Sequence, residues 1–172
     1  ILGLDVYAWV DMYKIWSKDY YPYEFNHFYN ICPDCLENDI NGKSDKNIKL
    51  DKIQSKEWEG VFLSPLNKKS NSYLLSLIFE LMSNFYLDGV ILDYLRYQDY
   101  YYGYNKAGLD DFMIEHNINP LDINREFILK KYGYNNIEID SIKNLWNDYK
   151  SQKITDLLIS IKNKSIKDSL YF

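Results

Sequence analysis

The spacing of apolar and polar residues changes several times along the chain, and each change predicts an element of an α/β protein. The alternating segment 2–10 predicts a strand with one apolar face. Short apolar runs within 58–65 and 89–93 are too brief for helices and predict buried parallel strands. Apolar residues at helical spacing predict helices at 73–86, 107–116, 125–132 and 140–164.

The predicted strand at 89–93 is the strongest clue to the fold. A helix and a tight turn at Gly89 precede it, and it ends at Asp93. In α/β barrels a polar residue at the carboxyl end of a strand is usually catalytic, whereas one at the other end is structural. Asp93 is therefore the candidate catalytic residue, and Asp88 is expected to support the turn. We expect residues 1–172 to form one domain, a partial (β/α)8 TIM barrel of about three to four β/α units, truncated at both ends.

Residues 11–57 are polar and aromatic and show no sustained period, which predicts a long βα-loop over the barrel mouth with one short helix. Cys32 and Cys35 lie in this segment, five residues after His27. The spacing permits half of a zinc site, a redox-active pair, or two ordinary loop cysteines that can form a local disulfide. The sequence leaves these alternatives open, and we expect neither a metal nor a cofactor.

Composition narrows the classes of partner. The chain has 172 residues, 47% of them hydrophobic and 17% aromatic, which supports a packed core in one domain. Its formal net charge of −5 argues against binding to duplex nucleic acid. The 18 tyrosines suit core packing or platforms for sugars or bases, although stacking on single strands needs a cationic groove. No stretch is apolar and long enough to predict a membrane span.

Arginine is scarce, since only Arg96 and Arg125 occur among the 20 basic residues. A planar guanidinium binds carboxylates in a bidentate manner that lysine does not reproduce. Arg96 follows Asp93 by three residues. It can pair with Asp93, bind a substrate hydroxyl or carboxylate, or anchor the loop through a structural ion pair.

The run DGVILDYLRY at 88–97 resembles the DGIHLDYIRYP signature of the glycosyl-hydrolase-like family 10 barrels, formerly DUF187. Four weaker similarities occur in the same order as in the family. Ala8-Trp9 resembles the family's HAW strand end, and residues 63–67 resemble its LNPG strand end. Residues 102–104 resemble its YG loop, and residues 146–154 resemble its W..WR...I helix. The chain departs from the family in having Ile91 for His, Gln98 for Pro and Lys150 for Arg.

The resemblance implies a TIM-barrel glycoside hydrolase that cleaves O-glycosyl bonds of a bacterial polysaccharide such as cell-wall glycan. It also implies an exported protein, whether periplasmic, lipid-anchored or extracellular. Asp93 would be catalytic, and the residues expected to bind substrate are Trp9, Asn67, Tyr94, Arg96, Tyr97, Tyr104 and Trp146. The alternative is a non-catalytic carbohydrate-binding barrel or pseudoenzyme.

A complete barrel has eight strands and typically ~250 residues. The sequence predicts only three convincing strands, so we expect the second carboxylate, the general acid, to lie beyond Phe172. The alternatives within the chain are Asp5 and Asp11, near the first strand, and a carboxylate in the 34–59 region. We also expect open sheet edges that favour self-association.

Overall fold

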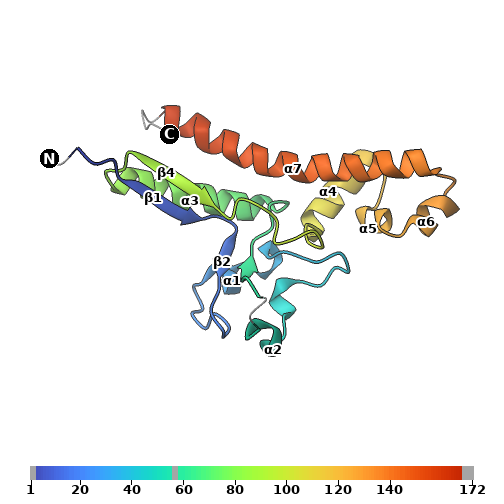
Figure 1. Ribbon diagram of the computed structural model, residues 1–172, viewed down its shortest axis with the longest axis horizontal. Helices are drawn as coiled ribbons and strands as arrows, with labels where there is room; N and C mark the ends of the chain where they lie inside the picture. Colours follow the sequence, from blue (N-terminus) through green and yellow to red (C-terminus); the bar gives the residue numbers. More distant parts are fainter. Residues whose placement is uncertain (1–2, 56–57, 168–172) are drawn as a thin grey trace.

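The computed structural model describes residues 3–55 and 58–167, which form an elongated molecule with one long helix running along it (Figure 1). In chain order the elements are β1 (Tyr7–Asp11), β2 (Lys14–Trp16), α1 (Phe28–Ile31), η1 (Pro33–Cys35), η2 (Asp45–Asn47), α2 (Leu50–Ile53), β3 (Val61–Phe62), α3 (Lys68–Asn84), β4 (Gly89–Asp93), α4 (Lys106–His116), α5 (Pro120–Ile123), α6 (Glu126–Lys131) and α7 (Asn136–Lys167).

The predicted TIM barrel is wrong. Within the described ranges the strands form two sheets of two strands each, β1 with β4 in parallel and β2 with β3 antiparallel. After β1 the chain forms β2, which pairs with one edge of β3, and Leu36 forms an antiparallel bridge with Leu63 on the other side. Because each strand edge accepts one partner only, β3 does not join β1 and β4, and the fold is a mixed α/β structure.

The prediction of a long loop over residues 11–57 is also wrong. This segment contains β2 and several short helices, and it supplies much of the core. Met12, Tyr13, Cys35 and Leu36 are all fully buried. These residues stand as isolated pairs between polar stretches, so they create no period that would predict their burial.

The β1–β4 sheet has one covered and one open face. Val10, Val90 and Leu92 pack against the core cluster that includes side chains of α3 and α7. On the opposite face, Trp9 and Ile91 are register partners and are both exposed. The alternation of residues within β1 and β4 therefore places one apolar face toward the helices and leaves the other face uncovered, while Leu4 and Val6 of the predicted apolar face precede β1 and are exposed.

Gly89 is required where β4 begins. It is the register partner of Tyr7, and a Cβ atom at Gly89 would lie 2.7 Å from the Cε1 atom of the Tyr7 ring. At the same end of the sheet, the Asp88 carboxylate accepts a hydrogen bond of 2.6 Å from the backbone N–H of Val6. These contacts set the parallel register that brings Asp11 and Asp93 together at the other end.

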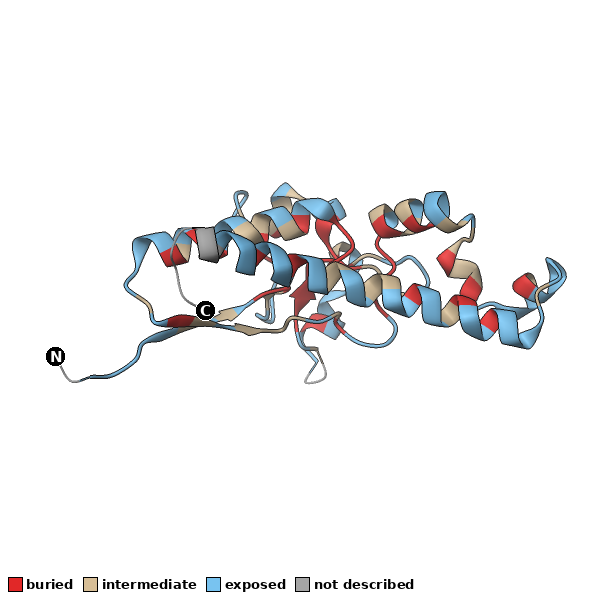
Figure 2. Cartoon of the chain, turned by 90° about the horizontal axis from the view of Figure 1, so that it is seen from above, coloured by how far each residue is buried: buried red, intermediate tan, exposed pale blue. Residues whose placement is uncertain are grey.

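Helix α7 links two separate cores. Its Leu157 and Ile161 belong to the core around β2, β3 and α3, while Ile142 and Trp146 belong to a second core with α4 and α5. Figure 2 shows buried positions recurring along α7, as expected for a helix that packs over most of its length. No helix in the described ranges has the length and apolar character needed to cross a membrane.

Candidate functional site

Two carboxylates meet at the carboxyl edge of the β1–β4 sheet. Asp11 and Asp93 are the last register partners of the two strands. Neighbouring strands lie ~4.8 Å apart and partnered side chains project from the same face. The two carboxylates therefore lie side by side on the open face of the sheet, together with Trp9.

Asp93 is held by two donors. The indole Nε1 of Trp9 donates to Oδ2 of Asp93 at 3.0 Å, and the backbone N–H of Tyr94 donates to Oδ1 at 2.7 Å. Both bonds suit an ionised carboxylate. The Trp9 side chain remains 68% exposed, so its ring offers an open apolar surface beside the carboxylate.

Lys14 lies on the Asp11 side of the site. Its Nζ atom is 3.1 Å from Oδ2 of Asp11 and 3.4 Å from the centroid of the Tyr94 ring. Burial lowers the pKa of the Lys14 ammonium, but its contacts with Tyr94 and Asp11 outweigh that effect and leave the pKa above its ordinary value. Lys14 is therefore a fixed cation in contact with Asp11.

Tyr94 adopts an unusual backbone conformation where the chain leaves β4. Its φ angle is +49°, in the left-handed region that residues with a side chain seldom occupy. Such conformations cost roughly 1–3 kcal/mol and cluster at functional sites. The backbone N–H of this residue is one of the two donors to Asp93, so the strained turn out of β4 forms part of the site.

Arg96 does not fulfil the expected pairing with Asp93. Its Nη2 atom lies 2.8 Å from Oε2 of Glu59, and its Nη1 atom donates to the backbone carbonyls of Tyr97 and Gln98. These contacts anchor the segment after β4 to the residues before β3. Of the three alternatives for Arg96, the structure therefore contains the ion pair that anchors the loop.

The other expected substrate-binding residues lie away from this edge. Asn67 is the N-cap of α3, and the hydroxyl of Tyr97 donates to the backbone carbonyl of Lys150 at 3.0 Å. Tyr104 and Trp146 pack together in the second core, with 4% and 2% of their surfaces exposed. Trp9, Asp93 and Tyr94 come together with Asp11, and the guanidinium of Arg96 lies 5.3 Å from the centroid of the Tyr94 ring.

A second pair of carboxylates lies in the 34–59 region, where the sequence offered an alternative acid without indicating which residue. Glu37 and Asp45 are 0% and 1% exposed, and both lie in the segment that the sequence suggested was a loop. The backbone N–H of Gly103, whose φ angle is +93°, donates to Oε2 of Glu37 at 2.6 Å. The backbone N–H of Phe62 donates to Oδ2 of Asp45 at 3.1 Å. Within the described ranges, the other oxygen of each carboxyl group has no hydrogen bond.

Burial dominates the acidity of this second pair. It raises the pKa of Glu37 to about 8, helped by the neighbouring Asp45 and opposed by Ser64, Gly103 and Lys150. Burial likewise raises the pKa of Asp45 to about 7 against the opposing effects of Phe62, Tyr102 and Lys52. Because protonated carboxyl groups are less costly to bury than ionised ones, burial favours the protonated form of Glu37 below about pH 8 and that of Asp45 below about pH 7. Nothing in the sequence distinguishes these two acids from their exposed neighbours.

The cysteines do not form half of a zinc site. Cys32 and Cys35 are joined by a disulfide, which leaves no pair of thiolates for a metal. Across residues 3–55 and 58–167, no three His, Cys, Asp or Glu side chains are grouped in a way that could hold a metal ion.

Comparisons with models of known protein families, with curated proteins and with solved structures give no significant match. The resemblance to the glycosyl-hydrolase-like family 10 barrels therefore depends on the quoted residues alone.

Proposed function

We propose that this chain is a glycan-acting protein that hydrolyses O-glycosyl bonds at the carboxyl edge of the β1–β4 sheet. The observation that carries the proposal is the register pairing of Asp11 with Asp93 beside the exposed ring of Trp9. Glycoside hydrolysis needs two carboxyl groups, ~5–5.5 Å apart in retaining enzymes and ~6.5–9.5 Å apart in inverting ones. The spacing between neighbouring strands favours the shorter separation.

The contacts of the two acids suggest their roles. Asp93, which accepts two hydrogen bonds, suits the ionised carboxylate that attacks or stabilises the sugar. Asp11 takes the part of the acid, in place of a residue beyond Phe172. For that role the 3.1 Å contact between Lys14 and Asp11 must open when substrate binds. Trp9 offers its ring face to the C–H surface of a sugar.

Glycan binding without hydrolysis is the second candidate. The ion pair between Lys14 and Asp11 favours it, because a carboxylate paired with an ammonium is a poor proton donor. The disulfide between Cys32 and Cys35 supports an oxidising compartment for either function, in keeping with the exported location that the resemblance implies.

The test measures binding to bacterial cell-wall glycan and release of reducing ends. We expect Asp93→Asn to lower turnover by a factor on the order of 10³ or more while leaving the fold intact, since the amide is isosteric. Asp148→Asn is the control, because Asp148 is an exposed residue of α7, outside the sheet, and the turnover of this variant should equal that of the wild type. Binding that is lost in Trp9→Ala, without turnover in the wild type, would establish the binding function instead. A wild type that neither binds nor cleaves would exclude both.

We also propose that the open sheet mediates self-association. The outer edges of β1 and β4 have no strand partner among the described residues, and Tyr7, Trp9 and Ile91 are exposed between them. Such surfaces favour pairing with a second copy. Light scattering should detect a dimer or larger species that Ile91→Lys converts to a monomer, and a monomeric wild type would refute the idea.

A further inference from the structure

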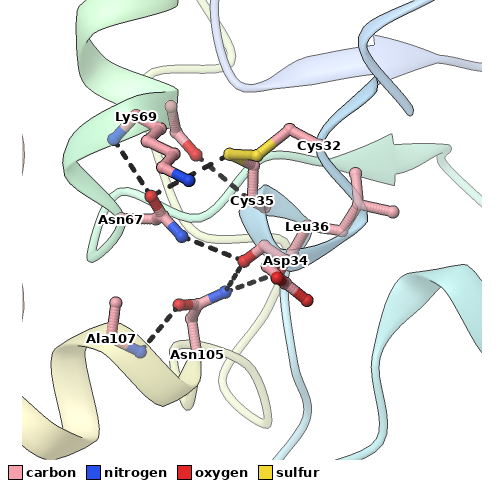
Figure 3. The surroundings of a disulfide bond; sticks show 9 residues. Cys32, Asp34, Cys35, Leu36, Asn67, Lys69, Asn105 and Ala107 are labelled. Carbon is pink, nitrogen blue, oxygen red and sulfur yellow. Dashed lines mark hydrogen bonds between the residues drawn. A yellow bond between two sulfur atoms is a disulfide. The ribbon is translucent and has the colours of Figure 1, made fainter. Parts of the chain in front are cut away.

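The disulfide between Cys32 and Cys35 lies where three parts of the chain meet. It closes the short turn η1, and the N-termini of α3 and α4 approach that turn from different directions (Figure 3). Cys35 is fully buried, whereas Cys32 is partly exposed. The two sulfur atoms therefore differ in their access to a reagent from solvent.

One carbonyl in the disulfide loop connects the starts of both helices. The backbone oxygen of Asp34 accepts hydrogen bonds from the side-chain amides of Asn67 at 2.9 Å and Asn105 at 2.8 Å. Asn67 is the N-cap of α3 and accepts from the N–H of Lys69, while Asn105 is the N-cap of α4 and accepts from the N–H of Ala107. The disulfide loop thus orients both capping side chains (Figure 3).

Access to the disulfide is from the side of Cys32. This residue lines a cavity of about 390 Å³ whose other lining residues are Phe28, Ile31, Lys68, Lys69 and Ser72. The positive charges of the lining residues Lys68, which is paired with Asp111, and Lys69 favour the approach of an anionic thiolate. Attack on Cys32 makes Cys35 the sulfur that leaves.

We propose that Cys32–Cys35 is a thiol–disulfide exchange site, that its partner is a dithiol reductant, and that reduction releases the N-caps of α3 and α4. A thiolate of the reductant attacks Sγ of Cys32 and forms a mixed disulfide, while the bond between Cys32 and Cys35 breaks and Cys35 leaves as a thiolate that takes up a proton. The second thiol of the reductant then loses its proton and attacks the reductant's own sulfur in the mixed disulfide. Cys32 leaves as a thiolate and is protonated. The net result is two protein thiols and one oxidised reductant.

Reduction changes the hydrogen bonding at the cap of α3. The Sγ atom of Cys35 lies 3.9 Å from Oδ1 of Asn67, and in the disulfide this sulfur carries no proton to donate. The thiol formed by reduction is a donor, and it competes with the N–H of Lys69 for the same oxygen. Opening the disulfide ring also frees the Asp34 carbonyl to move away from both asparagine amides, of which that of Asn105 also donates to the backbone oxygen of Leu36 at 2.8 Å.

The test treats the folded chain with dithiothreitol and follows amide hydrogen exchange together with alkylation of each cysteine. We expect Cys32 to be alkylated faster than Cys35. We also expect the amides of Lys69 and Ala107 to exchange about fivefold faster after reduction, the factor for loss of one N-cap. The amide of Ile142, which lies in the second core, should not change.

Asn105→Ala in the oxidised protein is the matched control. It removes one cap and leaves the disulfide in place, so exchange should accelerate at Ala107 and not at Lys69. A disulfide that dithiothreitol reduces only in denaturant would overturn the proposal. So would unchanged exchange at both amides after reduction, because the disulfide would then be a static link with no effect on the caps.

Discussion

The chain contains two pairs of carboxylates in opposite environments. Asp11 and Asp93 lie on an open sheet face, and each is bound by a side-chain donor, Lys14 for Asp11 and Trp9 for Asp93. Glu37 and Asp45 are enclosed in the core, where each has only one hydrogen-bonded oxygen in the described structure. Solvent reaches the first pair, whereas the second pair is desolvated, and Lys150 and Lys52 oppose only part of the resulting rise in pKa. The surroundings of a pair of acids therefore decide its role. An exposed pair can act on a bound ligand, whereas a buried pair makes the stability of the fold depend on pH.

The largest effect should be the dependence of stability on pH. The folded-state pKa values are about 8 for Glu37 and about 7 for Asp45, against ~4 for unfolded carboxyl groups. The folded protein therefore holds more protons than the unfolded chain between pH ~4 and ~8. The free energy of unfolding should fall across that interval as pH rises, by on the order of a few kcal/mol.

Chemical denaturation at pH 5 and pH 8 measures this difference. Glu37→Gln keeps the size of the side chain and removes its titration, so the stability difference between the two pH values should shrink. Asp93→Asn, in the open pair, should leave the difference as it is in the wild type. Equal pH dependence in the wild type and Glu37→Gln would show that the buried acid does not control it.

Replacing Tyr102 should change the free energy of unfolding by a smaller amount. Its hydroxyl lowers the pKa of Asp45 by hydrogen bonding to the ionised form. Tyr102→Phe removes that interaction and should cost about 1 kcal/mol at pH 8 and less at pH 5, where Asp45 is protonated in either protein. Tyr101→Phe is the control, since Tyr101 is 61% exposed and its hydroxyl should not matter. Equal losses at the two pH values would contradict a role linked to Asp45.

The smallest expected change in the free energy of unfolding follows from altering the open pair, Asp11 and Asp93. Asp93→Asn removes one of two neighbouring negative charges, but solvent screens their repulsion. We expect the free energy of unfolding to change by less than ~1 kcal/mol, and to change less in high salt than in low salt. A loss of several kcal/mol that is independent of salt would show that Asp93 is a structural residue.

Local pattern was sufficient to predict several parts of this molecule. The strand at 89–93 coincides with β4, and the helix predicted at 107–116 differs from α4 by one residue. An apolar run between a glycine and an aspartate, or an apolar stripe at helical spacing, defines its element without help from distant residues. Asp93 as a strand-end carboxylate followed from the same reasoning.

Tertiary structure decided how these elements combine. No local signal states that residues 14–16 pair with β3 and so exclude a barrel, because strand pairing depends on contacts between distant segments. The same holds for the pairing of Asp11 with Asp93 and for the burial of Glu37 with Asp45. The sequence by itself determined which residues could form strands, helices and carboxylate sites. Only packing determined which acids became neighbours and which lost their water, because desolvation depends on everything that surrounds a side chain.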